Sequence, residues 1–177
     1  ETGYVATVVR FMARHPKVGA VGGRGRAVSD RPLPPWFDLV AGQLAVRDLG
    51  GEAFRLQGDA PCGAGMALRR APMEKAFSWP LLLVDRQGAK LSSGGDTELC
   101  RRIELDGWEL WYEPAMTLEH HLEGRRFEVE YLERLNEGFG RARPFMDLYA
   151  TPRMKWRRIQ SLRRARFERS ESRRLAA

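Results

Sequence analysis

The sequence has few cysteines and no long apolar run. Only Cys62 and Cys100 occur among 177 residues, and no Cys-x-x-Cys pair is present. This excludes a disulfide-rich secreted framework and argues against a structural zinc site. The longest apolar run, around residues 79–84, is far shorter than the roughly 20 residues of a membrane-spanning helix. These absences, with no visible signal peptide, favour a reduced, cytoplasmic setting.

Charge is distributed unevenly along the chain. The formal net charge is +7, and residues 151–177 alone carry ten Lys or Arg against two acidic residues, so residues 1–150 are close to neutral. With 43% apolar and 10% aromatic residues, the chain is long enough for one domain with a true core. We therefore expect a globular domain at residues 1–150 and a basic tail at residues 151–177.

The tail has the pattern of a basic amphipathic helix, because four large apolar residues fall near one helical stripe: Trp156, Ile159, Leu162 and Phe167. Such a helix can lie on an anionic membrane surface, which would place the protein at the inner face of the membrane. A solvated helix that packs its apolar stripe on the domain explains the pattern as well, and a frayed terminus is a further alternative. The near-neutral body has no interleaved basic and aromatic face, so specific nucleic-acid binding is not expected.

Alternating helical and extended patterns predict the α/β class. The expected elements are a helix at Tyr4–Arg14, a strand at residues 18–28, a proline-rich loop leading into an amphipathic segment up to Val46, a strand at 62–68, a short helix from Pro72, a long loop at 85–95, a helix from Asp96 that stops at Gly107, strands at 108–112 and 116–121 separated by Pro114, and a helix at 127–143.

Asp96 follows Gly94 and Gly95 at the point where loop is expected to become helix. The pattern predicts Asp96 as the N-cap, accepting hydrogen bonds from the first-turn N–H groups. A purely structural cap accounts for this local pattern. A chemical role for Asp96 needs support from the rest of the chain.

That support comes from the order of several short motifs. Gly95-Asp96-Thr97-Glu98-Leu99-Cys100-Arg101-Arg102 is followed by Asp106-Gly107-Trp108, by Tyr112-Glu113-Pro114 and by His120-His121. The succession resembles the second half of the family 2 inverting glycosyltransferases, which have the Rossmann-like GT-A fold. Three upstream segments fit the resemblance, which spans residues 4–145: residues 15–23, Pro34-Pro35-Trp36-Phe37 and residues 62–70.

The resemblance implies a role for each of several residues. Asp96 would be the general base that takes the proton from an acceptor hydroxyl during attack on a nucleotide-sugar, and the acceptor would be a saccharide or a lipid-linked saccharide. His120 or His121 would contact a divalent metal, Mn²⁺ or Mg²⁺, or the diphosphate. Because adjacent strand residues point to opposite faces, at most one serves, and His120 is in phase with Met116 and Leu118. Backbone-bonded edge histidines are the structural alternative.

The remaining expected contacts are with substrate. Gly63, Ala64, Gly65 and Gly95 would let a sugar or diphosphate approach the backbone, although a strand bulge or tight packing also requires small residues. Trp36 would stack on an acceptor sugar, or else serve as a packing anchor. Gly95 stands where the family usually has a second acidic residue, which removes one carboxylate from the expected acceptor pocket.

Two family motifs are absent. The sequence contains no Asp-x-Asp, which holds metal and ribose in the family, and no Gln-x-x-Arg-Trp of processive members. Processive synthesis is therefore not expected. We interpret the chain as the acceptor-side portion of a longer enzyme whose nucleotide-binding half lies upstream of Glu1, and we expect it to bind nucleotide poorly by itself. The competing hypothesis is a non-catalytic module that binds membrane or nucleic acid through its basic tail.

Overall fold

The computed structural model describes residues 3–83 and 93–149, which form a four-stranded mixed sheet with flanking helices. The two long strands β1 (Val18–Ser29) and β4 (Glu109–Leu122) pair in parallel at its centre. The short strands β2 (Phe54–Arg55) and β3 (Ala67–Leu68) pair antiparallel with β4 and β1, giving the order β2-β4-β1-β3. The predicted α/β class is confirmed.

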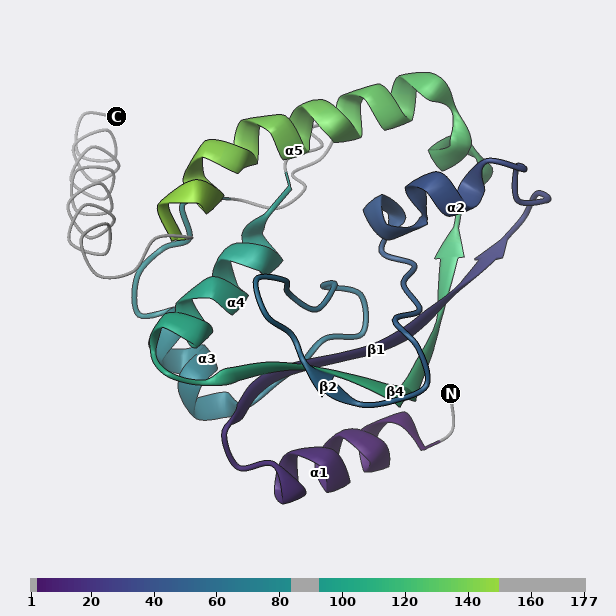
Figure 1. Ribbon diagram of the computed structural model, residues 1–177. Coiled ribbons are helices and arrows are strands. Elements are labelled where there is room, and N and C mark those ends of the chain that lie inside the picture. Colours follow the sequence, from purple (N-terminus) through teal and green to yellow (C-terminus); the bar gives the residue numbers. More distant parts are fainter. Residues whose placement is uncertain (1–2, 84–92, 150–177) are drawn as a thin grey trace, which may run out of the picture.

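Helices cover both faces of this sheet (Figure 1). Helix α1 (Tyr4–Arg14), which has the predicted bounds, lies on one side, and α3 (Arg70–Ala76), α4 (Gly95–Leu105) and α5 (Val129–Tyr149) lie on the other. Short turns of helix, α2 (Phe37–Val40), η1 (Ala41–Leu44) and η2 (Gly124–Phe127), complete the side of α5. None of the described helices is both long and apolar enough to cross a bilayer.

The core is divided by the sheet into two layers. On the α1 side, Phe11 packs against Val18, Val21 and Met116. On the α4 side, the buried residues come from the sheet and from one stripe of the helix: Ala20, Leu110, Leu99, Cys100 and Ile103. Apolar residues three and four apart turn this stripe of α4 toward the sheet, which leaves the helix N-terminus at the border of the core. Cys100 lies on this inward stripe and has no exposed surface.

Pro114 does not end a strand, contrary to the prediction. β4 continues through it, and the pairing with β1 jumps from Gly22↔Tyr112 to Arg24↔Thr117, so residues 113–116 bulge opposite Gly23 alone. A bulge accommodates proline because the missing N–H removes no ladder hydrogen bond there. Gly23 makes the close approach possible, since an added Cβ would lie 1.8 Å from the carbonyl oxygen of Met116.

The strand predicted at residues 62–68 is also mostly wrong. Only Ala67–Leu68 is extended in the sheet, and residues 62–66 form a turn in which Met66 N–H donates to the carbonyl of Gly63 (3.3 Å). Gly65 has φ +71°, a left-handed conformation that glycine adopts without strain. The glycine-rich sequence therefore makes a loop that approaches the start of α4.

The predicted helix from Asp96 and the predicted helix at residues 127–143 are both present, but their ends differ from the prediction. α4 begins at Gly95 with Gly94 as its N-cap, so Asp96 lies in the first turn and is not the cap. Gly107, at φ +92°, follows the C-terminus as predicted. α5 starts two residues later than expected and runs to Tyr149 through Pro144. The predicted basic helix at 151–177 and most of the predicted loop at 85–95 lie outside the described residues.

Candidate functional site

An open pocket of about 780 Å³ lies on the side of the sheet that carries α4 and α5. Its walls come from η1, the loop at residues 59–64, the start of α4, the end of β4 and one face of α5. The volume is in the range of small-molecule sites. Several predicted site residues line it, namely Asp96, Gly63, Ala64 and His120.

The carboxylate of Asp96 is half-buried at this pocket and is held by backbone donors. Gly63 N–H donates to Oδ2 at 2.9 Å, and Thr97 N–H donates to Oδ1 at 2.7 Å. A Cβ added to Gly63 would lie 2.8 Å from Oδ2, so the absence of a side chain there permits this contact. The glycine-rich loop and α4 thus fix the carboxylate without covering it.

The two histidines separate as predicted from strand alternation. His120 is half-buried and lines the pocket, whereas His121 is exposed and does not line it. Both sit near the end of β4, paired with Ala27 and Val28 of β1. Of the pair, His120 alone is placed to meet a ligand that reaches Asp96.

Three other predicted substrate residues, Gly65, Gly95 and Trp36, are not lining residues of the pocket. Gly65 packs under α1, where the Tyr4 hydroxyl donates to its carbonyl. Gly95 is buried in the first turn of α4. Trp36 is the N-cap residue of α2 and 37% exposed. None of the three is a lining residue of the pocket, so the structure does not place their predicted substrate contacts there.

The described residues do not by themselves provide a metal site. No group of three His, Cys, Asp or Glu side chains among residues 3–83 and 93–149 is arranged to hold a metal ion. Divalent cations need several oxygen or nitrogen ligands. His120 and Asp96 can therefore supply only part of a coordination shell.

An ion pair between Arg47 and Asp59 orders another part of the pocket wall. The guanidinium of Arg47 donates to the carboxylate of Asp59 and to the carbonyl of Ala60 (3.0 Å). Burial by itself would raise the pKa of Asp59, but the hydrogen bonds from Arg47 and from Ala60 N–H outweigh it and lower this pKa. Asp59 therefore stays ionised and holds Arg47 in place along the pocket.

The Cys62 thiol is near enough to the carboxylates of Asp96 and Asp59 to interact with both charges. Burial raises its pKa, the negative charges of Asp96 and Asp59 raise it further, and Arg47 opposes the rise. Both cysteines are free thiols, and burial raises the pKa of Cys100 to about 12. A thiol with a raised pKa is a poor nucleophile at neutral pH. Cys62 is therefore not a candidate nucleophile of the pocket.

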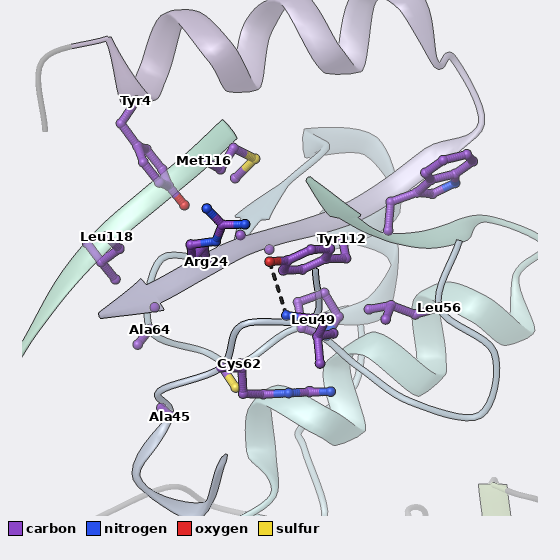
Figure 2. A pocket seen from close by; sticks show the side chains of 16 residues that line it. Tyr4, Arg24, Ala45, Leu49, Leu56, Cys62, Ala64, Tyr112, Met116 and Leu118 are labelled. Carbon is purple, nitrogen blue, oxygen red and sulfur yellow. Dashed lines mark hydrogen bonds between the residues drawn. The ribbon is translucent and has the colours of Figure 1, made fainter. Parts of the chain in front are cut away.

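A second, smaller cavity lies behind Cys62 and Ala64 (Figure 2). Tyr4, Arg24, Tyr112 and other side chains enclose about 20 Å³, and the Tyr112 hydroxyl accepts a hydrogen bond from Leu49 N–H at 3.2 Å. This volume suits about one water molecule. It is too small for a sugar, so the cavity is part of the packing that supports the glycine-rich loop.

Several pocket residues are not among the sequence candidates. They are the arginines Arg47, Arg101, Arg126 and Arg143, with Cys62 and an apolar strip of α5 made by Leu135, Phe139, Ala142 and Met146. The apolar strip is detectable from its helical spacing, and the sequence predicts Leu135 to face inward. The arginines carry no local signal that separates them from solvent-exposed ones.

No protein-family model, no curated protein and no solved structure matches this chain. Its class therefore follows from its own architecture, a mixed α/β domain with a carboxylate-bearing pocket at a helix N-terminus.

Proposed function

We propose that the protein is an inverting glycosyltransferase of the GT-A type, with the described domain forming its acceptor side. One observation carries the proposal. Asp96, the Gly63-Ala64 loop and His120 come from segments distant in sequence, and all three line one open pocket. These are residues to which the family resemblance assigns the base, the substrate floor and a diphosphate or metal contact.

The chemistry would proceed at Asp96 Oδ1 or Oδ2. An acceptor hydroxyl attacks the anomeric carbon of a nucleotide-sugar while the carboxylate takes its proton, and the bond from that carbon to the nucleoside diphosphate breaks on the opposite side. The new glycosidic bond then has inverted configuration. The N–H donors of Gly63 and Thr97 keep the carboxylate oriented, and the half-buried position leaves one side open to the hydroxyl.

The acceptor is a saccharide, free or lipid-linked, in this proposal, and a divalent cation is expected from the resemblance alone. Metal dependence is checked by measuring turnover in Mn²⁺, in Mg²⁺ and after chelation. His120→Ala should weaken activity at low metal concentration, and His121→Ala is its matched control because His121 faces away from the pocket.

The deciding experiment replaces Asp96 by asparagine in the longest form of the protein that its gene encodes. Release of nucleoside diphosphate from a panel of nucleotide-sugars is measured with and without saccharide acceptors. Loss of the base should reduce turnover by about 10²–10⁴-fold with little change in thermal unfolding. Near-normal turnover in Asp96→Asn would contradict the proposal.

Asp38→Asn is the matched control, because Asp38 is an exposed first-turn aspartate of α2 that does not line the pocket. Its turnover should equal that of the wild type. A protein that shows no turnover with any donor and binds its ligands only through residues 151–177 would instead fit the non-catalytic module.

A further inference from the structure

The charges that line the large pocket do not balance. Four arginines and two aspartates are among the lining residues: Arg47, Arg101, Arg126, Arg143, Asp59 and Asp96. The lining therefore has two more arginines than aspartates. A pocket with an excess of one sign of charge concentrates ligands of the opposite sign.

Two of the four arginines are already engaged. Arg47 pairs with Asp59. Arg101 pairs with Glu104 at 2.7 Å and also donates to the carbonyl of Gly58 at 2.7 Å. These two side chains therefore act as parts of the wall, and their charges are largely compensated.

Arg126 and Arg143 differ from them. Within residues 3–83 and 93–149, neither guanidinium has an ion pair or a side-chain hydrogen bond. Their neighbours in sequence are paired: Arg125 binds Glu123, and Arg141 lies 3.6 Å from Glu137. The paired neighbours do not line the pocket, and the unpaired arginines do. Both arginines are thus accessible to a ligand in the pocket.

The positions of the two arginines relate them to Asp96. Arg143 follows Ala142, which packs against the start of α4, since a Cβ added to Gly94 would lie 3.3 Å from the Ala142 Cβ. Arg126 belongs to η2, whose Phe127 packs against the apolar cluster that contains Leu135 of α5. Leu135 and Ala142 are seven positions apart on α5, which corresponds to a rise of about 10 Å along the helix axis at 1.5 Å per residue. The two arginines therefore belong to separate parts of the wall of the pocket that Asp96 also lines, and a ligand in this pocket can meet both cations.

We propose that the acceptor bound in this pocket carries oxyanions, carboxylate or phosphate, and that Arg126 and Arg143 are the residues that bind them. Guanidinium groups suit these anions because their planar donor fork matches two oxygens at once. The proposal rests on the proposed function in that it takes the same pocket as the acceptor site. Acidic saccharides and saccharides on a lipid diphosphate share this chemistry.

Direct binding tests the proposal without turnover. Calorimetric titrations use digalacturonate for the acidic saccharide, geranyl diphosphate for the lipid diphosphate, and neutral maltose as the uncharged comparison. Digalacturonate or geranyl diphosphate should bind with saturation, more weakly as salt rises. Whichever of the two binds more tightly identifies the source of the anion. Absence of saturable binding by both, or equal binding of maltose, would overturn the proposal.

Four variants locate the site. Arg126→Gln and Arg143→Gln should each weaken binding by about tenfold or more, because each removes a charge-assisted contact. Arg125→Gln and Arg141→Gln, the neighbours that do not line the pocket, should leave binding within about twofold, as expected for exposed pairs. Equal weakening by all four variants would indicate a general charge effect and overturn the assignment to this pocket.

Two further measurements separate this inference from the proposed function. Asp96→Asn should bind the anionic probe at least as well as the wild type, because it removes a negative charge from the pocket, although it should be inactive in transfer. Arginine-dependent probe binding by a protein without transferase activity would leave this inference standing and remove the proposed function. Arginine-dependent binding of a nucleoside diphosphate alone would overturn the acceptor assignment.

Discussion

Asp96 and Glu98 are two carboxylates in the first turn of the same helix, and their surroundings are opposite. Glu98 has no exposed surface and accepts hydrogen bonds from Arg102, from the Tyr149 hydroxyl (2.6 Å) and from Leu83 N–H (2.6 Å). Asp96 is partly exposed at the pocket and accepts hydrogen bonds from the backbone N–H groups of Gly63 and Thr97. Two residues of α-helix correspond to about 200° of rotation, so the side chains point to opposite sides of the helix.

The difference separates a carboxylate that is buried within the fold from one that a ligand in the pocket can reach. Arg102 donates to the carbonyls of Ala76, Trp79 and Pro80, each at 2.8 Å, besides binding Glu98. The Glu98–Arg102 pair therefore joins α4 to the segment after α3 and, through Tyr149, to the end of α5. This fixed side of the helix holds the other side, with Asp96, at the border of the pocket.

Among the changes that test this contrast, Glu98→Ala should destabilise the fold most. Removal of one partner leaves Arg102 as a buried charge without its counter-ion, which typically costs about 3–5 kcal/mol of free energy of unfolding. Urea denaturation of the wild type and the variant measures the loss. Glu104→Ala is the control on the same helix, because Glu104 is partly exposed and pairs with Arg101. Its cost should be about 1 kcal/mol or less. Similar costs for both variants would contradict the comparison.

A smaller change tests the pocket side of the helix. In Gly63→Ala the new methyl group lies 2.8 Å from Asp96 Oδ2 and displaces the carboxylate from its N–H donor. Misplacement of a catalytic group by a fraction of an ångström to about 1 Å should reduce turnover by about 10–100-fold. Unfolding should change little, because Gly63 is exposed.

Gly42→Ala is the matched control for this substitution. Gly42 lines the same pocket, and an added Cβ there meets nothing within 4 Å. Turnover should stay close to that of the wild type. A loss of activity in Gly42→Ala as large as in Gly63→Ala would show that the contact with Asp96 is not the cause.

How far the sequence predicts this molecule depends on whether the information is local. The helix at Tyr4–Arg14 and the helix that ends before Gly107 follow from the spacing and end signals within one element, and both are present. The continuous strand through Pro114 could not be predicted, because the bulge depends on Gly23 in a distant strand.

The candidate site shows the same limit. Motif order singles out Asp96, Gly63 and His120, and strand alternation selects His120 over His121 as the one that faces the pocket. The string Asp-Thr-Glu does not reveal which carboxylate is buried, since that depends on Arg102, Tyr149 and Leu83. Arg126 and Arg143 escape prediction for a related reason. An arginine that lines a pocket differs from a surface arginine in the walls that surround it, and these walls come from other elements.

The subtlest contrast is between the two cysteines, one beside the pocket and one in the core behind α4. Cys62 lines the pocket and should react slowly with iodoacetamide in the folded protein, because burial raises its pKa. Cys100 has no exposed surface, and its pKa is raised to about 12. It should react only after unfolding. Mass spectrometry of the alkylated protein, with Cys62→Ser as control, measures both rates.

Because burial raises the pKa of Cys100, this thiol should lower the free energy of unfolding at alkaline pH. The thiol keeps its proton in the folded protein up to about pH 12, whereas in the unfolded chain it titrates near its ordinary pKa of 9.0. Its contribution to stability is therefore complete below pH 9.0 and decreases as the pH rises toward about 12. Cys100→Ala should remove this part of the alkaline loss. An equal alkaline loss in wild type and variant, or alkylation of Cys100 in the folded protein as fast as that of Cys62, would show that the core side of α4 is open and that the contrast between its two sides does not hold.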